Sequence, residues 1–259
     1  MASDVVFGLR DCRVLARREM RHVFRHIDGL LTSLILPVLL LLMFTYLFGG
    51  GLEQALPDGQ SYLEYVTPGI LIMTVCYCAS TTAARVSTDW STGFVERLRS
   101  MPIVRPAFLV GHIITAMARN VGSVVVALVV AVLLGYRVQS GWGDSLAAAA
   151  ILVGFALALT SLAVLIGVVA SSPDAASTCT MLLMILPYFS GAFVPLGTMP
   201  GPLRIVCRYQ PMNTVWTAIH ELLAGQATPS IAGALAWCVG LTVGCLVISS
   251  IIFSRKTGQ

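Results

Sequence analysis

The residues best suited to do chemistry lie in one charged stretch, TDWSTGFVERLRSMP at positions 88–102, between two long apolar runs. One ionised side chain at the centre of a bilayer costs about 3 kcal/mol or more, so this stretch belongs at a membrane surface. A short helix is expected over about 91–101: Ser91 or Thr92 supplies its N-cap, Gly93 lies at its start, and Pro102 stops it. We interpret it as a cytoplasmic helix that receives mechanical work from a separate protein; the alternative is an ordinary solvated loop.

The side chains of this helix divide by helical spacing into an apolar face and a charged face. The apolar face is suited to the membrane domain or to a docking groove, and the charged face to solvent or a partner. The candidate contact residues are Gly93, Phe94, Glu96, Arg97, Leu98, Arg99 and Pro102.

Motifs for other chemistries are absent from the sequence. It has no GxxxxGK[ST], HExxH or GxSxG, and its one lysine is Lys256, so the chain cannot form a P-loop. Its four histidines are scattered, and no metal site, catalytic residue or cofactor is predicted. No Asp or Glu lies inside a predicted span, whereas ion-coupled carriers bury such residues. The sequence therefore predicts a non-enzymatic membrane body that is driven from outside.

Composition places the chain in a membrane. It has 259 residues, of which 57% are hydrophobic and 11% charged, against roughly 25% charged in soluble domains. The seven cysteines suggest no disulfide framework. The first apolar run starts near residue 30, after a long Arg-rich segment, so we expect no cleavable signal peptide.

The N-terminal domain, residues 1–29, is expected to contain an amphipathic interface helix. Apolar residues recur at steps of three and four, opposite a row formed by Arg10, Arg13, Arg17 and Arg21. Such a helix is suited to the headgroup layer of membrane lipids, with the arginines toward anionic lipid. The alternative, a nucleic-acid-binding arm, is disfavoured because aromatic stacking residues are sparse, and no nucleic acid partner is predicted.

The fold class expected for residues 30–253 is an all-α membrane domain with six spans. Residues 103–118 are expected to approach along the interface before bending into the third span. The proline-rich stretch 195–230 is too short in its apolar pieces to span and is predicted to be a re-entrant or interfacial helical hairpin. A tail, 254–259, follows. The predicted spans are about 30–48, 66–87, 114–134, 146–170, 177–194 and 231–253.

Basic residues predict the orientation by the positive-inside rule. If the N-terminus is cytoplasmic, both termini and the charged helix share that side, and the hairpin is external. The cytoplasmic side then holds twelve basic residues, Arg10, Arg13, Arg17, Arg18, Arg21, Arg25, Arg85, Arg97, Arg99, Arg105, Arg255 and Lys256. The external side holds three, Arg137, Arg204 and Arg208. We expect a multi-pass protein of a bacterial cell membrane.

Arg119 is the one charge that sequence places inside a span. It is interpreted either as a contact to an anionic headgroup or substrate, or as a partner of a carboxylate on a neighbouring helix. The alternative is an arginine that extends its head to the cytoplasmic boundary.

Four segments resemble the ABC-2 type transporter permeases, especially the daunorubicin/doxorubicin-resistance type of drug exporter. They recur in the order and spacing of that family, so the resemblance covers nearly the whole chain. The segments are YLEYVTPGILIMT (62–74), GFVERLRSMPIVRPAFLVG (93–111), LLGYR (133–137) and FSGAFVPLGTMPGPLRIVCRYQPMNTVWTAIHELLAG (189–225).

The resemblance implies the ABC-2 (type V) exporter fold, with an interface helix, six spans, a coupling helix and external re-entrant helices. It implies two copies of a separate ATPase subunit, which hold ATP and magnesium, and a second permease copy as a homodimer or paralogous heterodimer. By resemblance, Glu96 lies in the coupling helix, and Pro195, Pro200 and Pro211 shape the hairpin. Gln210 stands where relatives commonly have Asn, and His220–Glu221 where they commonly carry Arg.

These features together favour an export permease for a hydrophobic or amphipathic drug, antibiotic, lipid or glycolipid, embedded among membrane lipids. One alternative is a polysaccharide-export permease of the same superfamily, which would need aromatic residues along a wide channel. Another is a membrane immunity or assembly partner that moves nothing.

Overall fold

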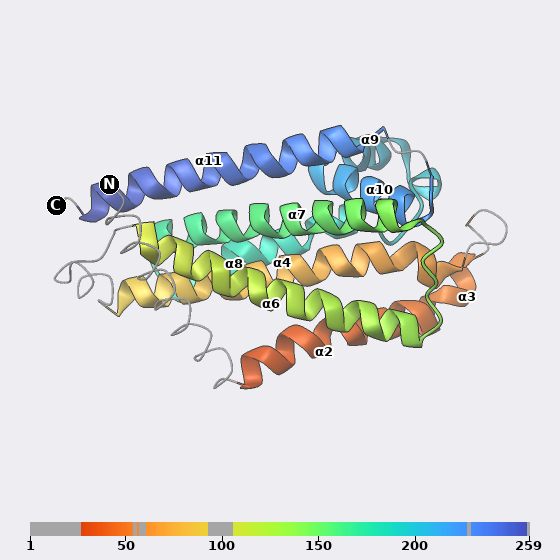
Figure 1. Cartoon of the computed structure of the whole chain (residues 1–259), viewed down its shortest axis with the longest axis horizontal. Coiled ribbons are helices and arrows are strands. Elements are labelled where there is room, and N and C mark those ends of the chain that lie inside the picture. Colours follow the sequence, from red (N-terminus) through yellow and green to blue (C-terminus); the bar gives the residue numbers. More distant parts are fainter. Residues whose placement is uncertain (1–26, 54–55, 57–60, 93–105, 227–228, 258–259) are drawn as a thin grey trace.

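The computed structural model describes residues 27–53, 56, 61–92, 106–226 and 229–257, and all regular structure among them is helical (Figure 1). The predicted interface-helix arginines, Arg10, Arg13, Arg17 and Arg21, lie outside the described residues. So do the predicted coupling residues from Gly93 to Pro102. Both elements therefore stay predictions.

Four long helices run side by side along the long axis of the molecule (Figure 1). They are α4 (Tyr62–Ser91), α6 (Pro106–Leu133), α7 (Trp142–Val169) and α11 (Ile231–Thr257). Among the described residues, these are the four helices long and apolar enough to cross a membrane. At about 1.5 Å per residue each exceeds the ~30 Å of a bilayer core. The chain is therefore a multi-pass membrane protein.

The first predicted span, 30–48, lies within α2 (Ile27–Met43) and the turns that continue it. A π-helical turn, Phe44–Phe48, and the short α3 (Gly49–Leu52) follow without a break. The apolar part of this stretch, Ile35–Gly51, is shorter than the four long helices. The prediction of six spans thus rests on this segment and on the predicted fifth span.

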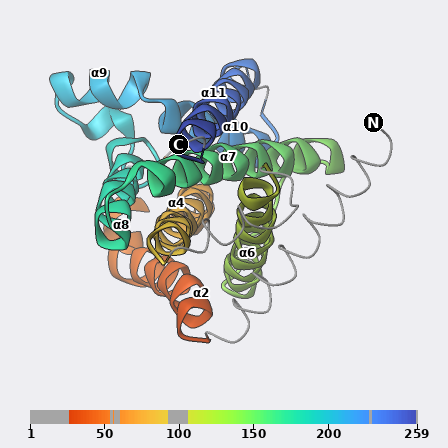
Figure 2. The ribbon, with the colours of Figure 1, turned by 90° about the vertical axis from the view of Figure 1, so that its left-hand side faces the viewer.

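The centre of the bundle is α4, which α2, α6, α7 and α8 surround when the molecule is viewed along its axis (Figure 2). Within its apolar window 89% of the residues are buried. A buried hydroxyl needs a hydrogen-bond partner, because water is absent. The hydroxyls of Thr67, Thr74 and Thr82 each donate to the backbone carbonyl four residues earlier, at 2.6–2.8 Å. These internal bonds let a helix with several threonines lie in an apolar core.

A glycine allows α4 and α7 to pack closely. A Cβ on Gly167 of α7 would lie 2.7 Å from the carbonyl oxygen of Ala83 and 2.7 Å from Cβ of Val86, both on α4. Only a residue without a side chain fits there. At the opposite end of α4, Gly69 packs against Ala192 in the same way, with a virtual Cβ 2.9 Å from the Ala192 carbonyl oxygen.

The structure corrects two helix boundaries near the charged stretch, the start of the helix after it and the end of the helix before it. Residues 106–118 are not an interfacial approach segment, because α6 is one uninterrupted helix from Pro106. Ser91 is the last residue of α4, which extends beyond the predicted end of the second span at about 87, and Thr92 is its C-cap. The hydroxyls of Ser91 and Thr92 donate back to the carbonyl oxygen of Thr88, at 3.0 and 2.9 Å. Whether either residue also caps the predicted coupling helix stays a prediction, because that helix lies outside the described residues.

The predicted fifth span, 177–194, is not a regular helix. The helix α8 (Pro173–Met181) starts earlier than predicted, with Ser172 as its N-cap and a proline in its first turn. It continues only as 3₁₀ turns at Leu182–Met184 and Leu186–Phe189. Pro187 has no amide hydrogen to donate, so a regular α-helix cannot pass through it undisturbed.

The stretch 195–230 contains two short helices, α9 (Gly201–Tyr209) and α10 (Pro211–Leu223), joined at Gln210. Pro211 begins α10, Pro200 is the N-cap residue of α9, and Pro195 precedes a 3₁₀ turn at Leu196–Thr198. A proline suits the first turn of a helix, where amide hydrogens have no intrahelical partner.

Replacing Gly167 with Ala tests the contact between α4 and α7. The new methyl group would clash with Ala83 and Val86, and overpacking of this kind costs about 1–3 kcal/mol. We expect a lower midpoint of thermal unfolding in detergent. Gly240→Ala on α11 is the matched control, because a Cβ there meets nothing within 4 Å. Equal midpoints for the two variants would contradict the close contact.

Candidate functional site

The two ends of the bundle differ in their chemistry. We call the end where α4 stops and α6 starts the connector end, because residues 93–105 connect the two helices there. The end that holds α9 and α10 is called the hairpin end. Figure 1 shows the last turns of α11 at the connector end and the α6–α7 loop at the hairpin end.

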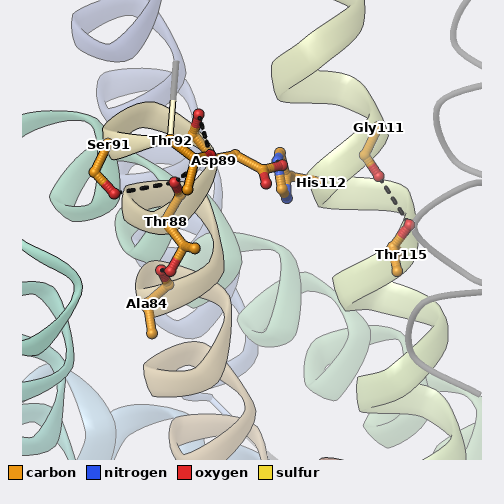
Figure 3. Close-up of polar contacts among 8 residues, drawn as sticks. All are labelled: Ala84, Thr88, Asp89, Ser91, Thr92, Gly111, His112 and Thr115. Carbon is orange, nitrogen blue, oxygen red and sulfur yellow. Dashed lines mark hydrogen bonds and ion pairs between the residues drawn. The ribbon is translucent and has the colours of Figure 1, made fainter. Parts of the chain in front are cut away.

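At the connector end, a carboxylate from the end of α4 contacts an imidazole near the start of α6 (Figure 3). Nε2 of His112, in the second turn of α6, lies 3.3 Å from Oδ2 of Asp89, in the last turn of α4. The two side chains are 6% and 19% exposed. A pair that is this little exposed is screened less by water and salt than a surface ion pair. The contact therefore fixes the distance between the two helices that residues 93–105 connect.

An apolar cluster at the same end includes residues of the two other long helices. Its buried members are Val86, Leu109, Val164, Val168 and Phe253, from α4, α6, α7 and α11. The ring of Trp90 packs edge-on against Phe253, with centroids 5.7 Å apart at 77°. Four helices therefore pack together at this end of the bundle.

Arg119 lies near the middle of α6 and is buried against α4, with 8% of the residue exposed. Its guanidinium donates to the backbone carbonyl of Cys78 at 2.8 Å and to the hydroxyl of Thr82 at 2.6 Å. Among the described residues, no carboxylate lies within ion-pair distance of it. The burial argues against the snorkelling alternative, and the contacts to α4 replace the predicted carboxylate. Arg119 joins α4 to α6 halfway along their length.

At the hairpin end, hydrogen bonds fix an irregular turn at the end of the predicted fifth span, 177–194. Tyr62 donates its hydroxyl to the carbonyl of Phe193 at 3.0 Å, and Tyr65 donates to that of Gly191. The amide of Gly191 donates to Oδ1 of Asn213 on α10 at 2.9 Å. The first turns of α4 and α10 therefore position this turn from two sides.

His220 of α10 adds no positive charge to the hairpin end, and its neighbour Glu221 is oriented by a hydrogen bond. The imidazole of His220 stacks on Trp216, with centroids 4.9 Å apart and planes 9° apart. Burial lowers the pKa of His220 to about 4, because the charged form loses hydration. The ring is therefore neutral at physiological pH. Glu221 accepts a hydrogen bond from Ser230 at 3.3 Å.

The predicted site residues do not gather at one place. Arg119 lies between α4 and α6, whereas Pro195, Pro200, Pro211, His220 and Glu221 belong to the hairpin end.

Sequence reasoning missed the pairing of Asp89 with His112. An acidic side chain shortly before the connector and an imidazole shortly after it, on helices joined by that connector, could have indicated it. It also missed Asn213, for which the sequence carries no clear signal.

Comparison with known proteins identifies the family. Residues 10–223 match the ABC-2 type transporter family. The daunorubicin resistance ABC transporter permease protein DrrB1 of Streptomyces coeruleorubidus is 31% identical over 222 residues, which cover 85% of this chain and 75% of that protein.

Two relatives from Mycobacterium tuberculosis are more distant. The probable doxorubicin resistance ABC transporter permease protein DrrC is 22% identical over 87% of this chain and 81% of its own length. The doxorubicin resistance ABC transporter permease protein DrrB is 24% identical over 81% of this chain and 74% of its own length. With four long apolar helices and a connector end that unites them, this chain belongs to the ABC-2 type transporter family and is a membrane permease subunit of an ABC exporter.

Proposed function

We propose that this chain forms the membrane pathway for export of an amphipathic drug, antibiotic, lipid or glycolipid from the cell. Membership of the ABC-2 family implies a separate ABC ATPase as partner. The proposed assembly has two ATPase copies, which bind ATP and magnesium, and two permease copies. This chain supplies no catalytic residue to ATP hydrolysis.

The observation that carries the proposal is the construction of the connector end. Residues 93–105 connect α4 to α6, and the Asp89–His112 contact joins the end of α4 to the start of α6. Those helices share one apolar cluster with α7 and α11. Movement of the ATPase against residues 93–105 would then tilt the four helices as a unit instead of bending one of them. The positive-inside rule puts this end in the cytoplasm, where ATP is available.

The exposed apolar surface of the flank formed by α2 and α8 supports a hydrophobic cargo. Figure 2 shows both helices on the same side of α4. Leu39 and Leu47 from the first segment, and Leu182 after α8, are 57%, 74% and 61% exposed. Exposed apolar surface of this kind indicates contact with lipid, a second copy or a hydrophobic ligand. In the proposed assembly, this flank faces the second permease copy and the transport path.

Changes in the proposed coupling helix test where the ATPase acts. Glu96→Ala and Arg97→Ala should leave membrane insertion intact but uncouple ATP hydrolysis from transport, because each removes a charge from the partner-facing side. ATP turnover and drug export are measured in vesicles that hold both subunits. Arg208→Ala, an exposed arginine of α9, is the control. Normal export by both coupling variants would contradict the proposed role of this helix.

A double-mutant cycle tests the Asp89–His112 contact. Asp89→Asn and His112→Gln should each lower the export per ATP hydrolysed. The loss of export per ATP in the double variant should be smaller than the sum of the losses in the two single variants, because contacting residues couple by about 0.5–3 kcal/mol. The exchange of the two residues, Asp89→His with His112→Asp, should restore part of the coupling. Strict additivity together with failed rescue would show that the contact does not position the helices.

Replacement of Arg119 with Met separates a role in transport from a role in stability. A buried cation without a carboxylate costs desolvation energy, so a hydrophobic residue of similar length should keep or raise the midpoint of thermal unfolding. The carbonyl of Cys78 stays satisfied by Thr81 and Thr82. We expect export to fall by roughly tenfold, since charges inside a span usually serve function. If the Arg119→Met variant loses stability and export together, Arg119 has a structural role only.

A further inference from the structure

Two cavities at the hairpin end adjoin each other and differ in polarity. The polar cavity has a volume of about 570 Å³ and lies between the start of α4, the α6–α7 loop and α10; Glu64, Arg137 and Gln139 are among its lining residues. The apolar groove has a volume of about 290 Å³ and lies between α6 and α7, with α4 and α10 behind it. All its lining residues except Asn120 and Ser145 are aliphatic. Leu223 of α10 lines both spaces.

The α6–α7 loop separates the two spaces by the alternation of its side chains. Gly135, with a φ of +105°, ends α6, and the next residues continue without helical structure. Successive side chains of an extended segment point to opposite sides. This alternation holds from Arg137 to Gln139: Arg137 and Gln139 line the polar cavity, and Val138 between them lines the apolar groove. Tyr136, next to the end of α6, also lines the polar cavity. One ligand could therefore contact both spaces across this loop.

The junction of the two spaces lies at the depth of the lipid headgroups. The candidate spans in α6 and α7 end and begin on either side of the loop, at Leu133 and Trp142. Trp142 is 96% exposed, and exposed tryptophans of membrane proteins gather at the interface. The groove below the loop is open to the bilayer, since its edge residues Val125 and Val153 are 51% and 47% exposed.

The polar cavity offers one carboxylate and one guanidinium that do not neutralise each other. Among the described residues, neither Glu64 nor Arg137 takes part in an ion pair. Glu64 instead accepts a hydrogen bond from Gln139 at 3.2 Å, which orients its carboxylate. The negative charge of Glu64 also contributes to raising the pKa of Tyr136 to about 12, after burial as the larger cause. The phenol is therefore a neutral hydrogen-bond donor in the same wall.

We propose that the polar cavity and the apolar groove together bind one phospholipid of the surrounding bilayer whose headgroup carries both a phosphate and an amine. Arg137 would contact the phosphate, because a guanidinium matches phosphate oxygens in two-pronged hydrogen bonds. Glu64 would contact the ammonium group, and an acyl chain would lie in the groove between α6 and α7. The complementarity of two opposite charges above an apolar slot favours this occupant over a singly charged cargo. The inference depends on membrane insertion and not on the direction of export.

Native mass spectrometry of the full chain tests the proposal without the ATPase. The protein is purified with dioleoylphosphatidylethanolamine or with dioleoylphosphatidylglycerol, which has the phosphate but no amine. We expect the wild-type chain to retain the ethanolamine lipid preferentially. Arg137→Gln should reduce retention of both lipids by about tenfold, the scale of a lost charge-assisted hydrogen bond. Glu64→Gln should remove the preference between the two lipids and leave retention of phosphatidylglycerol unchanged.

Two matched pairs of variants separate this site from general lipid binding. Ala149→Phe fills the apolar groove and should abolish retention, whereas Ala150→Phe, at the next and also exposed residue outside the groove lining, should not. Arg208→Gln, an exposed arginine of α9 outside the cavity lining, is the control for Arg137→Gln. Midpoints of thermal unfolding are measured for all variants, so that a misfolded variant is recognised. Arg137→Gln and Glu64→Gln replace exposed or half-exposed groups and keep the test valid if Ala149→Phe unfolds.

Three results would overturn the proposal. The first is that the wild-type chain and Arg137→Gln retain each of the two lipids to the same extent. The second is loss of lipid in Ala150→Phe to the same extent as in Ala149→Phe. The third is retention of daunorubicin in place of phospholipid, with loss of the drug in Ala149→Phe, which would assign the two spaces to cargo.

Discussion

The need to bury α4 without leaving its polar groups unpaired constrains the whole structure. This helix lies at the centre of the bundle, where water cannot satisfy a hydroxyl or a carbonyl. Its threonines bond to its own backbone, and Cys78 offers a carbonyl that Arg119, Thr81 and Thr82 all use. A helix satisfied in this way can be packed closely, as it is against Gly167 of α7. The surrounding helices are arranged around that rigid axis.

The two ends of α4 are held by different kinds of interaction, which fits two different tasks. At the connector end, a carboxylate–imidazole contact joins α4 to α6, and an apolar cluster unites four helices beside the segment 93–105. At the hairpin end, tyrosine hydroxyls and Asn213 hold a turn without regular secondary structure. Irregular backbone at membrane depth is tolerated where protein side chains satisfy it. A force applied at the connector end would thus be carried along α4 to a region held by a few specific bonds.

Buried polar contacts between α4 and α6 recur from the connector end to the middle of the membrane. Asp89 meets His112, and further along Arg119 meets Thr82 and Cys78. Hydrogen bonds between membrane helices are individually modest, about 0.6–2 kcal/mol. Several along one pair of helices nonetheless fix its axial register, because a shift would unpair all of them at once. This fixed register is what the proposed coupling needs, and a purely apolar contact would not provide it.

The sequence by itself determined the properties that depend on composition and order along the chain. The long apolar runs required membrane helices, and they predicted a surface position for the charged stretch before Pro102, because both expectations follow from the cost of moving groups between water and lipid. The absence of nucleotide-binding and catalytic motifs likewise pointed to a permease, and the family comparison agrees. Prolines near residues 200 and 211 marked where α9 and α10 begin.

Only the tertiary structure decided which of many similar residues make contact. Gly240 and Gly244 have the spacing of close-packed helices yet meet no neighbour among the described residues, whereas Gly167 contacts α4 directly. Arg119 could have extended to the surface, but it bonds to a carbonyl 41 residues away. The adjoining polar and apolar spaces combine α4, α6, α7 and α10. Such features depend on the rotation and register of helices about each other, which small packing differences set and which no local pattern encodes.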